Sequence, residues 1–170
     1  MGRSGQVGSV LVVVGIVGAM AYFGLRASVF PNVPVSVDAT ETSSIDQLRG
    51  AKKKLVLALL IPGDPVSGQV VEMLKAEQAT YDAKAAFAGL LFADPAALDQ
   101  FRAAHDVPYP LVSITPQTNP VQYNEVVKAV GGASSRFYGG TVVVLDAARK
   151  IVKQVNGNEA ERLSETLKGL

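Results

Sequence analysis

The residue types that most often carry redox and metal chemistry are nearly missing from this sequence. None of its 170 residues is cysteine, which excludes a disulfide, a thiolate nucleophile and a cysteine-ligated metal or iron–sulfur cluster. His105 is the single histidine, so a multi-histidine zinc or haem site within the chain is excluded as well. We therefore predict no resident metal and no cofactor.

Ser67 is a candidate nucleophile, because the pattern around it predicts the first turn of a helix. A serine nucleophile needs a base within hydrogen-bond reach and a third group that orients this base. His105 is the only imidazole that could serve. We interpret Ser67 as a residue that caps the helix, and we predict no catalytic residue.

Four aspartates follow or precede predicted elements and could suggest a metal cluster. They are Asp64, Asp94, Asp106 and Asp146. Each also has a place in a turn or a helix cap, where aspartate is favoured for its short carboxylate. We favour the turn and cap roles over a metal site.

The overall charge excludes one class of partner. Lys and Arg total 16 against 15 Asp and Glu, which gives a formal net charge of +1. Nucleic-acid binding normally needs a strongly basic face, so we predict no nucleic-acid partner. Lys52, Lys53 and Lys54 form the only basic run, and we interpret it as the solvated entrance to a strand.

The first thirty residues predict a membrane anchor. Residues 4–25 contain no charge, and the 19 residues of 7–25 are nearly all apolar or small. As a helix they would reach about 28 Å, close to the thickness of a hydrocarbon core. A cleaved signal peptide is the alternative, since Ala19-Met20-Ala21 resembles a cleavage site, but the apolar run continues beyond it.

Small residues within this span could allow another helix to approach closely. Gly15 and Ala19 have the small-xxx-small spacing, and Gly18 lies between them, so these three are the candidate docking residues. Arg3 and Arg26 bracket the span and leave its orientation nearly balanced. We prefer the amino terminus inside and the carboxyl-terminal domain exported.

The remaining sequence divides into a linker, 30–43, and a folded domain, 44–170, after the anchor of residues 1–29. Prolines in 30–34 end the first helix, 35–38 fits a short strand, and 42–50 fits a capped helical turn. Strands are then predicted at 55–61, 88–93, 108–114, 141–146 and 150–155, and helices at 66–87, from Asp94-Pro95, from Asn119-Pro120 to about 132, and at 159–170. This order indicates an α/β domain with a mixed central sheet flanked by helices.

Three segments resemble the thioredoxin superfamily, and most closely its membrane-anchored bacterial thiol–disulfide oxidoreductases. They are 45–50, 101–110 and 143–152, the last with the pattern of an apolar strand, Asp, a turn, Lys and Ile. The resemblance implies a thioredoxin-like fold, and it implies a bacterial inner membrane with the domain on its periplasmic side. It also implies that His105 precedes a strand, away from the redox turn.

The resemblance places the family's redox motif, Cys-x-x-Cys at a helix N-terminus, at Val66-Ser67-Gly68-Gln69. Neither Val66 nor Gln69 can form a disulfide. The family's cis-proline position falls on Gly140, so this feature is missing too.

Together these patterns favour a non-catalytic accessory subunit of a bacterial membrane complex, with respiratory and photosynthetic complexes as possible hosts. Its partners would be the lipid bilayer and other integral membrane subunits, which the span and the segments 66–69 and 116–135 would contact. The alternative is a membrane-anchored assembly factor or chaperone that binds partners transiently in the degenerate groove. An enzyme is disfavoured.

Overall fold

The computed structural model describes residues 28–38, 40–132 and 136–170. A single mixed sheet of seven strands runs through this part of the chain, in the order β2-β1-β5-β4-β3-β6-β7. β3 (Lys54–Leu60), β4 (Ala85–Leu91) and β5 (Leu111–Ser113) are parallel, and β6 (Thr141–Leu145) and β7 (Ile151–Val155) add an antiparallel hairpin beside β3. β1 (Pro34–Ser36) and β2 (Thr42–Ser44) complete the other edge.

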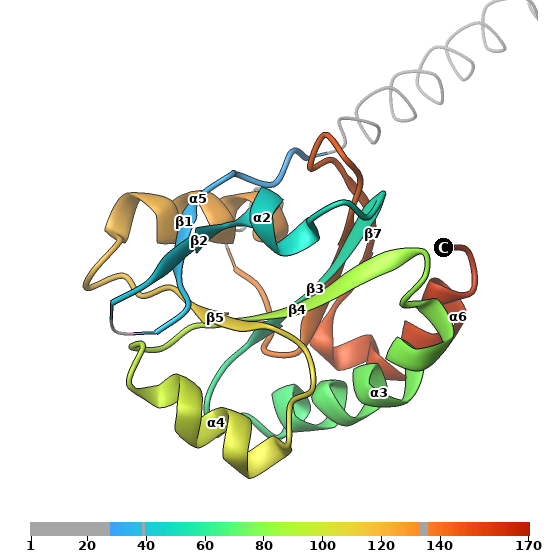
Figure 1. Ribbon diagram of the computed structural model, residues 1–170, viewed down its shortest axis with the longest axis horizontal. Helices are drawn as coiled ribbons and strands as arrows, with labels where there is room; N and C mark the ends of the chain where they lie inside the picture. Colours follow the sequence, from blue (N-terminus) through green and yellow to red (C-terminus); the bar gives the residue numbers. More distant parts are fainter. Residues whose placement is uncertain (1–27, 39, 133–135) are drawn as a thin grey trace, which may run out of the picture.

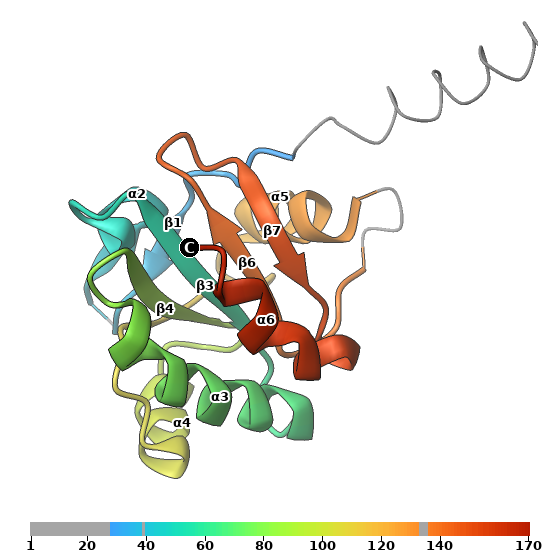
Figure 2. The same cartoon turned by 90° about the vertical axis from the view of Figure 1, so that its right-hand side faces the viewer.

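Helices cover both faces of the sheet (Figures 1 and 2). α3 (Pro65–Tyr81), α4 (Ala97–His105) and α6 (Leu163–Leu167), with the 3-10 helix η2 (Gly157–Arg162), lie on one face. α2 (Ile45–Arg49) and α5 (Pro120–Gly131) lie on the other. The predicted α/β architecture with a mixed sheet is therefore confirmed.

The central strand β3 is apolar at each position from Leu55 to Leu60, because both of its faces are covered. Alternate side chains of a strand point to opposite faces. Val56, Ala58 and Leu60 accordingly pack in the core beneath α3 and α4, whereas Leu55, Leu57 and Leu59 pack beneath α2 and α5. All six are fully buried, as expected for a parallel strand covered on both sides.

Several predicted boundaries are wrong. The helix predicted at 66–87 ends at Tyr81, and β4 begins at Ala85, because Ala85 to Phe87 pair in parallel with Lys54 to Val56. Pairing in the sheet overrides the helical propensity of this alanine-rich segment. The helix expected at Asp94-Pro95 begins at Ala97 instead, after a turn in which the Ala97 N–H donates to the Asp94 carbonyl at 2.9 Å.

The last predicted helix, 159–170, is also interrupted. It divides into η2 and the short α6, because Glu159 has non-helical backbone angles. Its predicted apolar contacts are nevertheless present, since Leu163 and Leu167 are fully buried.

The segment that the sequence indicated as a linker, 30–43, belongs to the folded domain. It contributes β1 and most of β2 to the sheet. Phe30 is fully buried, and Val33 and Val35 pack beside it in the core beneath α5. The domain therefore includes the chain from Phe30 onward.

The span itself, with the candidate docking residues Gly15, Gly18 and Ala19, lies outside the described residues. Within the described ranges, no helix has the length and apolarity needed to cross a bilayer.

Candidate functional site

The turn between β3 and α3 is held by one carboxylate and one hydroxyl. Asp64 is the N-cap of α3, and its Oδ2 accepts hydrogen bonds from the Ser67 backbone N–H at 2.8 Å and the Ser67 hydroxyl at 2.7 Å. Pro65 follows in the first turn, where its missing N–H costs no helical hydrogen bond. Asp64, rather than Ser67, is thus the capping residue, and Ser67 reinforces the cap.

Ser67 has no position from which to attack a substrate. Its side chain is fully buried, and its oxygen accepts a hydrogen bond from the Ile61 N–H at 3.0 Å while its proton is donated to Asp64. A nucleophilic hydroxyl must reach the substrate and must give its proton to a base. The Ser67 hydroxyl instead ties the end of β3 to the start of α3.

His105 lies closer to this turn than the sequence indicated. Its ring packs on Phe101 with centroids 4.5 Å apart, and a side-chain carbon added at Gly68 would lie 3.0 Å from His105 Cε1. The expectation that His105 is remote from the redox position is therefore wrong. It still forms no serine–histidine site, because the Ser67 proton is donated to Asp64.

The structure brings Gly140 against Val66, as the resemblance implies for the two halves of a redox site. A side-chain carbon on Gly140 would lie 3.0 Å from both the Val66 carbonyl oxygen and Val66 Cγ1. Gly140 has a φ of 76°, and its N–H donates to the Leu59 carbonyl at 2.8 Å. Proline would need a negative φ and has no N–H, so this backbone cannot accept it.

Val66 and Gln69 occupy the positions of the missing redox pair. Val66 is half-buried and packs against the core beneath α3, whereas Gln69 is exposed to solvent. Gly139 also approaches closely, since an added carbon there would be 3.0 Å from Ser67 Oγ. Backbone and aliphatic packing therefore fill the space between the two halves.

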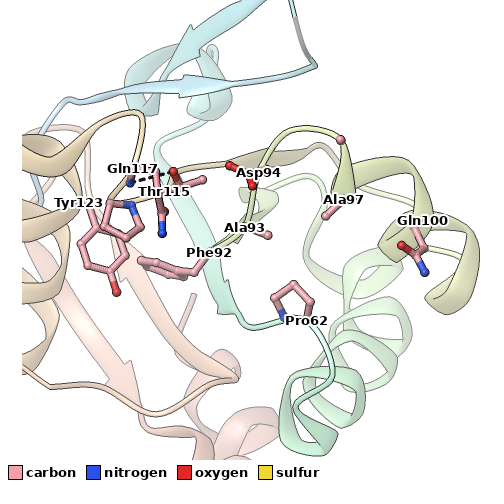
Figure 3. A pocket seen from close by; sticks show the side chains of 11 residues that line it. Pro62, Phe92, Ala93, Asp94, Ala97, Gln100, Thr115, Gln117 and Tyr123 are labelled. Carbon is pink, nitrogen blue, oxygen red and sulfur yellow. Dashed lines mark hydrogen bonds between the residues drawn. The ribbon is translucent and has the colours of Figure 1, made fainter.

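A pocket of about 700 Å³ opens beside this turn, at the carboxyl ends of the parallel strands. Figure 3 shows Phe92 and Tyr123 on one wall and Ala97 and Gln100 on the other, with Pro62 below. Such strand ends are the common ligand position in open α/β sheets.

The Phe92 and Tyr123 rings meet edge-on with centroids 5.5 Å apart, and the Phe137 ring packs on Phe92 at a tilt of 42° with centroids 4.6 Å apart. We did not predict this aromatic group from the sequence, where its members lie in three separate segments. The only signal was Phe92 at the end of an apolar run. Pro116, Gln117 and Tyr123 of the pocket do belong to the predicted contact segment 116–135, of which 133–135 lie outside the described residues.

The four aspartates do not converge. Asp64 caps α3, Asp146 Oδ1 accepts from the Ala148 and Lys150 N–H groups in the β6–β7 turn, and Asp106 lies 3.6 Å from Lys75. Asp94 lines the pocket wall. In the described part of the chain, no group of three or more such side chains is arranged to hold a metal ion.

Comparison of the fold with solved structures identifies its type. The thioredoxin domain of a thiol–disulfide oxidoreductase from Bacteroides vulgatus superposes with a TM-score of 0.62 at 14% identity, covering 83% of this chain and 96% of that one. The fold is thioredoxin-like. A peroxidoxin from Mycobacterium tuberculosis gives 0.62 at 14% identity over 85% and 96%.

A secreted disulfide oxidoreductase from Mycobacterium tuberculosis gives a TM-score of 0.58 at 17% identity, covering 82% of this chain and 96% of that one. At such identities the likeness of the thioredoxin-like domain to these proteins concerns the fold alone. No family model and no curated protein matches the sequence.

Proposed function

We propose that this chain is a non-catalytic accessory subunit of a bacterial membrane protein complex, in which a redox-inactive thioredoxin-like domain serves as a structural module. One observation carries the proposal. Where a redox pair would lie, Val66 and Gln69 flank a buried serine, and Gly139-Gly140 packs onto the same turn. A fold can keep its scaffold after losing its reactive groups, because activity resides in the site.

Anchoring by residues 4–25 is the second part of the proposal. The uncharged span ends at Leu25, and only Arg26 and Ala27 separate it from Ser28, the first described residue. Gly15, Gly18 and Ala19 would let a neighbouring helix approach it closely. We place the protein in the inner membrane with its domain in the periplasm.

The pocket beside the degenerate turn is the candidate surface for contact with the host complex. It lies at the carboxyl ends of β3 and β4, whereas the chain enters at the opposite end of the sheet. Val121 and Tyr138, which are close in sequence to Tyr123 and Phe137, are 63% and 61% exposed. Large apolar side chains that remain exposed can mark a protein contact site.

The openness of this pocket also favours the alternative, a membrane-anchored assembly factor or chaperone that binds partners transiently. Its wall combines aromatic rings with the polar side chains of Thr115 and Gln117, as a site for an extended segment would. Stoichiometry separates the two functions. A structural subunit is recovered at a fixed ratio to its partners, whereas an assembly factor is substoichiometric and leaves the mature complex.

Affinity purification of the tagged full chain from native membranes tests the proposal. We expect integral membrane partners at a constant ratio, and we expect Val121→Lys to reduce their recovery. Val152→Lys is the matched control, because Val152 is an exposed valine on β7, 44% accessible and outside the pocket wall. Partners recovered only in trace, varying amounts would favour the assembly factor, and insulin reduction by the pure chain would overturn the non-catalytic assignment.

A further inference from the structure

At the end of the domain where the described chain begins, paired residues of neighbouring strands lie side by side across the sheet. Lys54 pairs with Ala85, Leu55 pairs with Leu145, and Leu145 pairs with Ile151. The Ile151 N–H then donates to the Ser28 carbonyl at 2.9 Å, and Val29 bridges to Lys150. Figure 1 shows the blue start of the described chain beside the β6–β7 turn.

This entry end is strongly basic. α2, the segments that lead into β3 and β4, and the β6–β7 turn carry seven basic side chains and three carboxylates: Arg49, Lys52, Lys53, Lys54, Lys84, Arg149 and Lys150, against Asp46, Asp82 and Asp146. Since the whole chain has 16 basic and 15 acidic residues, the rest of it is slightly acidic. The near-zero net charge therefore conceals a marked polarity.

Among the five lysines of this end, Lys52 donates to the Asp82 backbone carbonyl, and Lys84 Nζ lies 5.9 Å from the centroid of the Tyr81 ring. The Asp46 carboxylate forms ion pairs with Arg149 at 2.6 Å and with Arg49 at 3.9 Å. The Asp146 carboxylate accepts hydrogen bonds from backbone N–H groups of its own turn. Among the residues that the structure describes, none of these lysines has a carboxylate within ion-pair distance. Lys53, Lys84 and Lys150 are exposed to solvent.

The distance from the predicted span to this end is very short. Only Arg26 and Ala27 separate the uncharged segment from Ser28, and two extended residues reach about 7 Å. That is comparable to the polar headgroup layer on one side of a bilayer. Ser28 and Phe30 are hydrogen-bonded to the β6–β7 hairpin, and Phe30 is fully buried, so the described chain is fixed to this end of the sheet from its first residues.

We propose that this basic end binds anionic phospholipid headgroups and holds the domain in one orientation against the bilayer. The inference rests on the proposed anchoring of the chain, and it adds the lipid class and the surface that recognises it. Lysines near an anionic surface attract it within a Debye length, about 10 Å at 0.1 M salt. The orientation directs the pocket of Phe92 and Tyr123 away from the membrane, toward extramembrane parts of a host.

The natural lack of cysteine makes a direct test simple. The full chain is reconstituted into nanodiscs of phosphatidylcholine with or without phosphatidylglycerol, and a fluorophore is attached to Ala148→Cys in the β6–β7 turn. Ala96→Cys is the matched control, an exposed alanine beyond the far end of β4. Quenching by nitroxide-labelled headgroups reports which end touches the lipid.

We expect the label at position 148 to be quenched more strongly when phosphatidylglycerol is present, and the label at 96 to be unaffected. Replacing Lys53, Lys84 and Lys150 by Gln should remove the lipid dependence, at about fivefold in the docked-to-free ratio per lysine. Raising the salt from about 0.1 M to about 1 M should act in the same direction. The variant Arg102→Gln with Arg136→Gln, at the far end, should behave as the unchanged chain.

Three results would overturn the inference, and they separate it from the proposed function. If the chain inserts but quenching at 148 is independent of lipid charge, or equals that at 96, the lipid surface is wrong and the anchored subunit stands. If the triple lysine variant docks as well as the unchanged chain, the basic end is not the recognition surface. If the chain does not stay with the nanodisc at all, the anchoring and this inference both fail.

Discussion

Ser67→Ala separates a structural serine from a reactive one. The Ser67 hydroxyl donates to Asp64 Oδ2 at 2.7 Å and accepts from the Ile61 N–H at 3.0 Å, in a fully buried position. Removing it breaks a hydrogen bond to a charged group and leaves the Ile61 N–H without its acceptor. The Ser67 backbone N–H still binds Asp64 at 2.8 Å, so part of the helix cap remains.

The expected change in the free energy of unfolding follows from the lost hydrogen bond to Asp64 and the unsatisfied Ile61 N–H. A hydrogen bond to a charged group contributes about 1.5–3 kcal/mol, and an unsatisfied buried donor costs about 1–3 kcal/mol. Because the two share one hydroxyl and some relaxation is possible, we expect a loss of about 3 kcal/mol in the free energy of unfolding. For a domain of this size that lowers the melting temperature by about 9 °C.

Urea unfolding of the full chain in detergent, followed by tyrosine fluorescence and circular dichroism, measures this loss. The midpoint should fall without a change in the slope, which shows that the compactness of the end states is unaltered. Ser28→Ala is the control, an exposed serine for which we expect a change within about 0.5 kcal/mol. If Ser67→Ala were as harmless as Ser28→Ala, the hydroxyl would not be structural and our reading of the turn would be refuted.

Three further predictions concern the same region. Val66→Cys with Gln69→Cys places two thiols three residues apart on one helix, within disulfide range. We therefore expect an intramolecular disulfide and loss of free thiols on mild oxidation. Two thiols that stay free would contradict the assignment of residues 66–69 to the redox-motif position. Gly140→Pro should destabilise the domain by about 3 kcal/mol, because φ is 76° and the N–H is used; a midpoint equal to that of the unchanged chain would contradict this. Burial, and then the Glu72 carboxylate, raise the pKa of the Tyr109 hydroxyl, which has no partner among the described residues, so Tyr109→Phe should match or exceed the unchanged chain at neutral pH. The unfolded tyrosine loses its proton above pH about 10 while the folded one keeps it, so stability falls there, and Tyr109→Phe should flatten that fall; a lower midpoint at neutral pH would show a hidden partner.

The sequence correctly predicted the features that depend on local patterns of residues. Continuous apolar runs predicted buried strands at β3 and β6, and the Asn119-Pro120 pair marked the start of α5. The ends of α3 and the start of α4 were wrong, because pairing of Lys54 with Ala85 and a turn after Asp94 depend on partners that are distant or irregular. Contacts between residues far apart in the chain cannot be read from local patterns in a single sequence.

For the site, the sequence predicted only which groups are missing: the two redox cysteines and the cis-proline. The absence of cysteine can be read directly from the composition. The glycine at the cis-proline position, Gly140, could be identified from the resemblance to the thioredoxin superfamily. The aromatic pocket and the basic end were not predictable, because Phe92, Tyr123 and Phe137, or Lys53 and Lys150, meet only through the topology of the sheet. The run of lysines at 52–54 is therefore part of a larger surface.

The mass of the native particle tests the account most directly. Membranes containing the tagged chain are extracted in mild detergent, and the mass and subunit ratio of the purified particle are measured. The account predicts a particle much larger than the 17.8 kDa chain, with integral membrane partners at a constant ratio. A solitary 17.8 kDa chain in its micelle, with no partner at any stage of purification, would contradict it.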